Sequence, residues 1–171
     1  MDISAIVLGL HPSAIPLTDF SISQPYGASP YISKWNTEKL GPVPSQTQLE
    51  AAWPEVQLAQ ARLAQMVIIK QGFLSTVSAP VTDGAENIWE GGMTSGSSIF
   101  LACQLAQQQG ATSITLYDAA KAPHSMTIAE GMSVAALIGA AYQAALGQKN
   151  TLYAQIAAAP TVADVQAVVW P

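Results

Sequence analysis

The sequence predicts an α+β fold with two long helices, short antiparallel strands or hairpins, and a proline-rich N-terminal extension. Apolar residues recur at spacings of three and four along residues 46–70 and 128–158, as on one face of a long helix. Short segments that alternate polar and apolar residues lie outside these stretches and are typical of strands. Six of the eleven prolines fall within residues 1–44, so regular structure must be short there.

The composition describes a globular chain of low charge. Its 171 residues are enough for about one domain with a small extension. Only 10% of the residues are charged, against a usual ~25%. The net charge is −5 and there is no basic cluster, so we expect no nucleic-acid partner. A surface of Gln, Ser, Thr, Asn and Ala suits a protein that other subunits cover, although a neutral monomer would look the same.

Signals for secretion and for a membrane span are weak. The N-terminus lacks the positive segment of a signal peptide, and the single cysteine, Cys103, cannot form an intramolecular disulfide. The apolar run that comes closest to a membrane span, Met132–Leu146, is mostly Ala and Gly and is shorter than the ~18 residues that a span needs. We therefore expect a soluble protein with no membrane partner.

The N-terminal part predicts a short helix followed by a hairpin. Asp2 is a suitable N-cap for a helix over Ile3–Leu10, which His11-Pro12 ends. Residues 19–23 and 31–36 alternate as strands do, and Gln24–Gly27 forms a turn between them.

A capping box begins the first long helix, with Ser45 as N-cap and Gln48 three residues later. The apolar pattern runs to Lys70 and stops at Gly72. Pro54 falls inside the pattern, where it either kinks the helix or marks a second start after Trp53.

The middle of the chain is rich in Ser, Thr and Gly. It predicts strands over Phe73–Val77 and Glu86–Glu90, with a turn at Asp83-Gly84. A short helix over Ile99–Gln109 follows, with Ser97 or Ser98 as its cap.

The last third predicts a hairpin and then the second long helix. Gly110 suits the end of the preceding helix, and Ser113–Asp118 alternates as a strand with His124–Met126 pairing back. Thr127 and Glu130 form a second capping box.

The second long helix ends at Ala159-Pro160. Gly139 and Gly147 within it permit close approach of another helix. Thr161 and Asp164 then cap a last short helix.

Few residues can support catalysis. His11 and His124 have no second ligand at metal-binding spacing, and Cys103 on an apolar helix face predicts a buried, inert thiol. A dyad of Cys103 with His124 has no specific support. The glycine-rich segment 91–96 lacks the lysine and the spacing of a phosphate loop, which leaves it a turn or loop.

Two of four acidic residues could form a carboxylate pair in space, as glycosidases need. Scattered carboxylates on turns are more often solvated. The four are Asp83, Glu86, Glu90 and Asp118. We expect no catalytic residue, no metal and no cofactor, and hence a protein that is not an enzyme.

Two motifs in the N-terminal part carry a family resemblance. Tyr31-Ile32-Ser33-Lys34-Trp35-Asn36 matches the pattern Y-I-x-x-W-N, and Pro44–Glu50 matches P-[ST]-x-x-x-L-E. This part resembles the XkdW-like proteins of phage-like tail gene clusters.

The region from about Arg62 onward resembles a domain of unknown function found in phage tail-fibre and tail-fibre assembly proteins. Its motifs are Ile68–Phe73, Ile114–Asp118, Met126–Glu130 and Ala158–Val165. The chain departs from the pattern where Asp118 is followed by Ala119 and not by glycine. We predict an XkdW-like region at 1–60 and a tail-fibre-associated α+β domain at 61–171; whether the first folds independently stays open.

The resemblance implies a non-enzymatic phage tail component, a baseplate or tail-fibre subunit or adaptor, which is made in the host cytoplasm and resides in the virion. The alternative is a tail-fibre assembly chaperone, and a third class is a small glycan-binding or hydrolytic module. The expected partners are tail-fibre or baseplate proteins, with a homo-oligomer as a further option. The candidate partner-binding residues are Trp89, Gly91, Gly92, Met93 and Trp170, for each of which ordinary core packing is the alternative.

Overall fold

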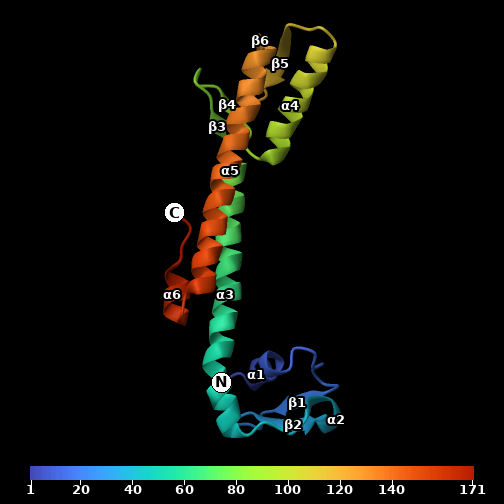
Figure 1. Ribbon diagram of the computed structural model, residues 1–171, viewed down its shortest axis with the longest axis vertical. Coiled ribbons are helices and arrows are strands. Elements are labelled where there is room, and N and C mark those ends of the chain that lie inside the picture. The colour runs from blue at the N-terminus through green and yellow to red at the C-terminus, as the bar shows by residue number, and fades with distance from the viewer. The chain divides into compact units, whose positions relative to one another are not determined.

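Six helices and six short strands alternate along the chain in a computed structural model that describes all residues from 1 to 171 (Figure 1). The helices are α1 (Ile3–Leu10), α2 (Thr37–Leu40), α3 (Gln46–Ser78), α4 (Met93–Gln108), α5 (Ile128–Ala158) and α6 (Val162–Ala167). The strands are β1 (Phe20–Ser23), β2 (Tyr31–Trp35), β3 (Val81–Thr82), β4 (Ile88–Trp89), β5 (Ser113–Tyr117) and β6 (Pro123–Thr127). Two long helices with short antiparallel strands confirm the predicted mixture of α and β structure.

The contacts divide the chain into two units, each of which is described by itself. The N-terminal unit comprises residues 1–64 and 159–166, and the helical unit comprises residues 65–158 and 167–171. The predicted domain division at 60/61 stays a prediction.

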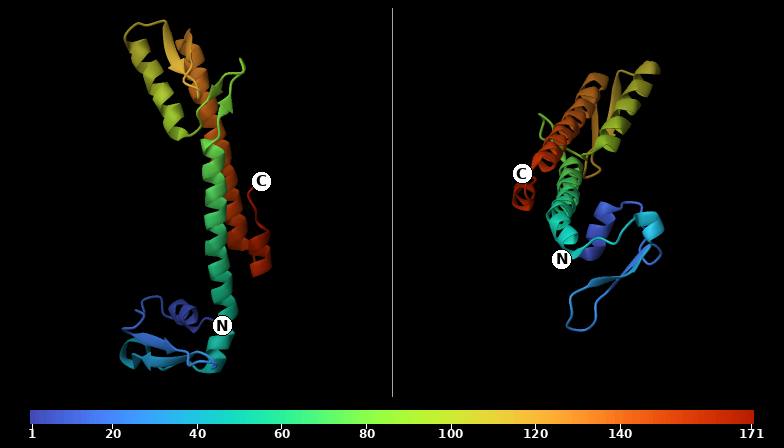
Figure 2. Two further views of the ribbon diagram at one scale, coloured as in Figure 1. Left: turned by 180° about the vertical axis from the view of Figure 1, so that it is seen from behind. Right: turned by 60° about the horizontal axis from the view of Figure 1, so that its bottom comes forward.

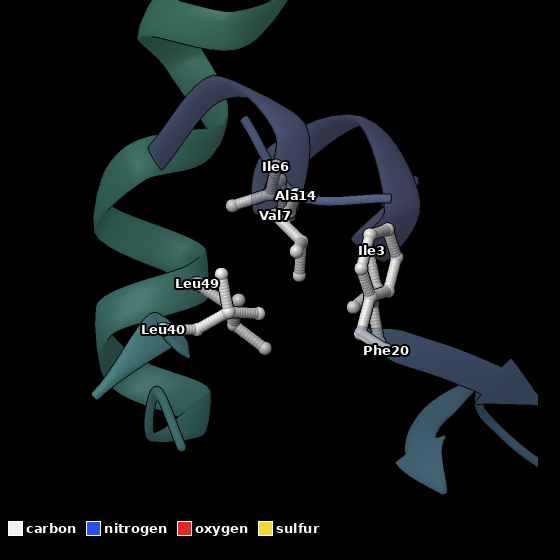
Figure 3. Close-up of a cluster of buried hydrophobic side chains, with 7 residues drawn as sticks. All are labelled: Ile3, Ile6, Val7, Ala14, Phe20, Leu40 and Leu49. Atoms are coloured by element: carbon white, nitrogen blue, oxygen red, sulfur yellow. The ribbon is translucent and has the colours of Figure 1, made fainter. Parts of the chain in front are cut away.

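In the N-terminal unit, the sides of α1, β1, α2 and α3 meet over one apolar core (Figure 3). Spacings of three and four place Ile3, Ile6 and Val7 on the same face of α1, which turns toward Phe20. Asp2 caps α1 as predicted, since its Oδ1 accepts from the Ala5 N–H at 3.0 Å. Burying these side chains is the main source of stability for so small a core.

The N-terminal strands pair as predicted, but the second one is shorter. β1 and β2 are antiparallel, with Phe20 opposite Trp35. Asn36 was predicted as strand, and instead it caps α2, where its Oδ1 accepts from the Lys39 N–H at 3.2 Å. The short helix α2, of only four residues, was not predicted from the sequence.

The start of α3 is confirmed and its predicted end is wrong. The Gln48 N–H donates to Ser45 Oγ at 3.3 Å, and the Ser45 N–H donates to Gln48 Oε1 at 2.8 Å. The helix continues through Pro54, so no second start occurs there, and it also continues past Gly72 to Ser78. Residues 73–77 are therefore helix and not strand.

The helical unit is built on the packing of α4 against α5. A Cβ on Gly131 would lie 2.6 Å from Cys103 Sγ, and one on Gly96 would lie 3.2 Å from Ile138 Cγ2. These two glycines let the helices approach more closely than any larger residue would. The β5–β6 hairpin packs on the same helices. The predicted pairing of these two segments is confirmed, and the register places Ile114 opposite Met126.

The predicted start of α4 is also wrong. α4 begins at Met93, because Gly92 at φ +97° is its N-cap, so neither Ser97 nor Ser98 caps it. Its end is as predicted. Gly110 at φ +76° donates to Gln107 O at 3.0 Å, and the Ala111 N–H donates to Ala106 O at 3.0 Å.

The second capping box and the last short helix are confirmed. The Thr127 N–H donates to Glu130 Oε2 at 2.7 Å, and the Glu130 N–H donates to Thr127 Oγ1 at 3.2 Å. Before α6, Thr161 Oγ1 accepts from the Asp164 N–H at 3.1 Å. Within the chain, nothing lies within 4 Å of a Cβ built at Gly139 or Gly147, so these two glycines are not used for close helix packing here.

α5 is long and apolar enough to cross a membrane by length and composition alone, contrary to the expectation from its sequence. Its apolar residues serve packing in the helical unit, where Val134 and Ile138 join the core around Trp89. Figure 2 shows α5 beside the part of α3 from residue 65 onward. Tyr153 Oη donates there to Met66 O at 3.2 Å.

Replacement of Gly131 by Ala is expected to destabilise the protein by about 1–3 kcal/mol, because the new methyl group overlaps Cys103 Sγ. Gly147→Ala is the matched control in the same helix. Its Cβ meets nothing within 4 Å, so a gain of roughly 0.5–1 kcal/mol is expected. Urea unfolding of the two variants measures both changes, and equal effects would contradict the close packing of α4 on α5.

The buried Asp19 carboxylate of the N-terminal unit should respond to pH through Lys39. The hydrogen bond from Lys39 lowers the pKa of Asp19 below 3.8, and the Ile15 N–H at 2.8 Å adds to this. The stability that this contact contributes is full above pH ~3.8 and is lost as the pH falls through the lower, folded-state pKa. NMR titration should find a higher Asp19 pKa in Lys39→Met than in the native chain. An unchanged pKa would show that Lys39 does not hold the carboxylate.

Candidate functional site

Four of the predicted partner-binding residues lie in the helical unit, where β4 leads into α4: Trp89, Gly91, Gly92 and Met93. Trp89 is fully buried. Its Nε1–H donates to Asp83 Oδ2 at 2.8 Å, and its ring lies 5.4 Å from the His124 ring, centroid to centroid. Direct contact of a partner with the Trp89 side chain would require this unit to open.

Asp83 organises the turn before β4. Its Oδ1 accepts from the Ala85 N–H at 2.9 Å and the Asn87 N–H at 3.0 Å, and its Oδ2 accepts from Asn87 Nδ2 at 3.0 Å and from Trp89. Burial by itself would raise the pKa of Asp83, but the hydrogen bonds from Asn87, Trp89 and Ala85 outweigh it and lower the pKa to about 2. All of its acceptor positions serve the turn, so this carboxylate is structural.

A second carboxylate, Asp118, faces His124 across the β5–β6 loop. His124 Nε2 lies 3.0 Å from Asp118 Oδ2, and the Ala122 N–H donates to Asp118 Oδ1 at 2.8 Å. The hydrogen bond with His124 is the main cause of the lowered pKa of Asp118. The sequence pattern did not predict Asp118 as a partner of His124, because the loop between the strands brings together residues six apart.

The remaining two predicted carboxylates, Glu90 and Glu86, are exposed. Glu90 forms an exposed ion pair with Lys121 on the loop after β5, a type of contact that contributes little stability. Glu86 lies exposed in the β3–β4 turn at φ +65°. No group of three or more His, Cys, Asp or Glu side chains is placed to hold a metal ion.

An open cavity of about 710 Å³ lies beside this polar cluster. The polar and charged side chains that line the cavity include Asp83, His124, Ser125, Glu130 and Ser133. Asp83 and Glu130 are engaged in the turn and the capping box, and Cys103 is buried with a raised pKa, owing to desolvation. The side chains around the cavity therefore serve mainly to pack the unit and to hold its loops in place.

Gly91 and Gly92 have structural roles. A Cβ on Gly91 would overlap the carbonyl oxygen of Ala79 at the end of α3. Gly92 adopts φ +97° to begin α4, a conformation that other residues rarely take. Met93, the next residue, is 44% exposed and is therefore the member of this segment that is available to a partner.

Trp170, the last candidate, holds the C-terminal segment on α3 within the helical unit. Its indole ring covers Gly72, and its Nε1–H donates to Thr76 Oγ1 at 2.9 Å. The ring also lies edge-on to Phe73 at 6.4 Å, centroid to centroid. Trp170 is half-buried by these contacts.

An apolar groove between α4 and α5 is the exposed feature that the sequence analysis missed. Its volume is about 540 Å³, and no charged residue lines it. The lining residues are Met93, Gly96, Ser97, Phe100, Leu101, Met132, Ala135, Ala136 and Gly139. The groove was missed because residues 93–98 were predicted as loop, which left the first turns of α4 off the helix face.

The comparisons with known proteins found a similarity in the N-terminal part of the chain. Residues 3–61 match the family model described as XkdW protein, in agreement with the motifs at Tyr31–Asn36 and Pro44–Glu50. The match indicates a phage-associated protein. It does not extend to residues 62–171, so the tail-fibre resemblance of that part stays a prediction. Neither the curated proteins nor the solved structures contain a match.

Replacing Asp83 by Ala is expected to destabilise the helical unit by about 1–3 kcal/mol, because the buried Trp89 N–H loses its acceptor. Glu90→Ala is the control, since it removes an exposed carboxylate from the same region and should cost less than about 1 kcal/mol. Near-ultraviolet circular dichroism and urea unfolding report the Trp89 environment and the stability. Equal losses for the two variants would contradict the structural role of Asp83.

Proposed function

We propose that the chain is a non-enzymatic structural component of a phage tail, positioned at the baseplate or on a tail fibre and binding other tail proteins. The match of residues 3–61 to XkdW protein carries this proposal. That segment contains all of α1, β1, β2 and α2 and the first part of α3, so it includes the whole core of Figure 3. The matched residues therefore include a folded core and not merely a short motif.

The helical unit supports a role in assembly through its surface. Large apolar side chains remain exposed on α4, among them Phe100 at 43%, Leu101 at 56% and Leu105 at 58%. Contiguous exposed apolar surface is typical of protein–protein interaction sites. The carboxylates beside the polar cavity are engaged in turns and caps, which favours a binding role over acid–base catalysis.

The proposal predicts that the chain remains in the mature particle. Quantitative mass spectrometry of purified virions should find it at a small integer ratio to the tail-fibre protein. The expected place of the protein is the virion tail after synthesis in the host cytoplasm. A matched measurement on the cell lysate shows that the protein was expressed.

Co-expression separates the alternatives. If the chain is absent from virions and the fibre protein is insoluble without it, the protein is a tail-fibre assembly chaperone and the structural proposal is wrong. If the chain is absent from virions and the fibre protein is unaffected, both assembly roles are wrong. The hypothesis to test is then a small glycan-binding or hydrolytic module.

A further inference from the structure

Residues 168–171, here called the strap, are seated on α3 within the helical unit. Gln65 of α3 is only 6% exposed, and its Nε2 donates to the Val168 carbonyl oxygen at 2.6 Å. Further along α3, Thr76 Oγ1 accepts from Trp170 Nε1–H at 2.9 Å. Two hydrogen bonds from or to side chains thus fix the strap at its two ends.

The indole ring of Trp170 fills a notch in α3 that a missing side chain leaves open. A Cβ built on Gly72 would overlap Trp170 Cβ and Cγ, so any other residue there would collide with the ring. Glycine weakens the interior of a helix relative to alanine, and the seated ring offsets this by filling the gap. Phe73 meets the indole edge-on at 6.4 Å between ring centroids, and Thr76 accepts the N–H. The notch therefore recognises both parts of an indole, the flat ring and its N–H.

The strap has the features of a segment that opens locally. No backbone hydrogen bond joins residues 168–171 to another backbone group. Val169 is 62% exposed, and Pro171 is exposed as well. Segments with few buried contacts and few backbone hydrogen bonds open at a smaller cost in free energy than the core does.

The aromatic residue beneath the strap has other partners besides Trp170. The Phe73 ring lies 5.8 Å from the Tyr142 ring, and Lys149 Nζ lies 4.6 Å from the Phe73 ring centroid. Tyr142 and Lys149 both belong to α5. These contacts between α3 and α5 do not involve the strap, so they do not depend on its being closed.

We propose that Gly72, Phe73 and Thr76 form a binding site for an indole side chain and that the strap is its detachable ligand, which opens while the rest of the helical unit stays folded. In the closed state Trp170 is half-buried on α3. In the open state the indole and the notch are both uncovered. The strap is thus a conformational device that controls the exposure of Trp170, a residue that the sequence predicts to contact a partner.

Native-state hydrogen exchange of the indole N–H groups, followed by NMR on the full chain at urea concentrations below the unfolding transition, tests the opening. The Trp89 N–H is the internal control, because it is fully buried in the same unit and donates to Asp83. The Trp170 N–H should exchange at least about tenfold faster, at a rate that does not depend on urea. Trp170→Phe removes the N–H and so identifies its signal. Equal rates with equal urea dependence would overturn the proposal.

Gly72→Ala tests the notch itself. The added Cβ takes the place of the ring, so the strap should remain open and the Trp170 N–H should exchange faster than in the native chain. The Trp89 N–H should keep its native rate, which shows that the unit is folded. Gly147→Ala in α5 is the matched control, since its Cβ meets nothing within 4 Å and both rates should stay native. An unchanged Trp170 rate in Gly72→Ala would contradict the notch.

A peptide supplied in trans tests recognition of the indole without relying on exchange rates. In full-length Trp170→Ala, the peptide Ala-Val-Val-Trp-Pro, which repeats residues 167–171, should shift the NMR signals of Gly72 and Thr76. A short tether supplies an effective concentration in the millimolar range, so a strap that is mostly closed implies a peptide Kd of about 1 mM or lower. The same peptide with Ala in place of Trp should leave these signals in place. No shift with either peptide, or equal shifts with both, would overturn the proposal.

The proposal goes beyond the phage role. All three measurements use the isolated chain, so their failure leaves the virion experiment unaffected.

Discussion

The close packing of α4 on α5 is the constraint on which the helical unit depends. Gly96 and Gly131 lack the Cβ atoms that would hold the two helices apart. Because the helices meet so closely, Cys103 is sealed between them and the β5–β6 hairpin covers the core around Trp89. Phe100 and Leu101 of α4 stay exposed beside this contact and line the groove between the two helices. Gly96 takes part in both features, since its missing Cβ admits Ile138 and it also lines the groove.

The helix starts were predictable where a local hydrogen bond decides them. The two capping boxes and the Asp2 cap each join residues three apart, so a short window of sequence contains the whole interaction. The end of α3 was not predictable in this way. Gly72 looked like a stop, but the residue that covers it, Trp170, lies almost a hundred positions later. A glycine that ends a helix and one that admits a distant ring look alike in a single sequence.

The candidate site, too, was only partly predictable from the local sequence. Trp89 and Met93 were predicted to contact a partner, with Gly91 and Gly92 between them, because Trp and Met are enriched at interfaces. The structure uses Trp89 in the core, where Asp83 accepts its N–H, and it uses Gly91 and Gly92 to turn the chain into α4. The usable surface lies further along, at Phe100 and Leu101, since starting α4 at Met93 places their side chains beside those of α5. The predicted segment was adjacent to that surface but did not contain most of it.

The distribution of charge follows the positions where the backbone needs an acceptor. Several of the eleven carboxylates hold backbone in place: Asp2 caps α1, Asp83 closes a turn and Glu130 completes a capping box. Acidic groups fixed in this way concentrate charge at helix starts and loops, and they leave long helical faces with none. A face without charge is weakly hydrated, so covering it with another protein incurs a smaller desolvation penalty than covering a charged face. α4 contains no Asp, Glu, Lys or Arg, so its exposed face has the low desolvation cost of an uncharged surface.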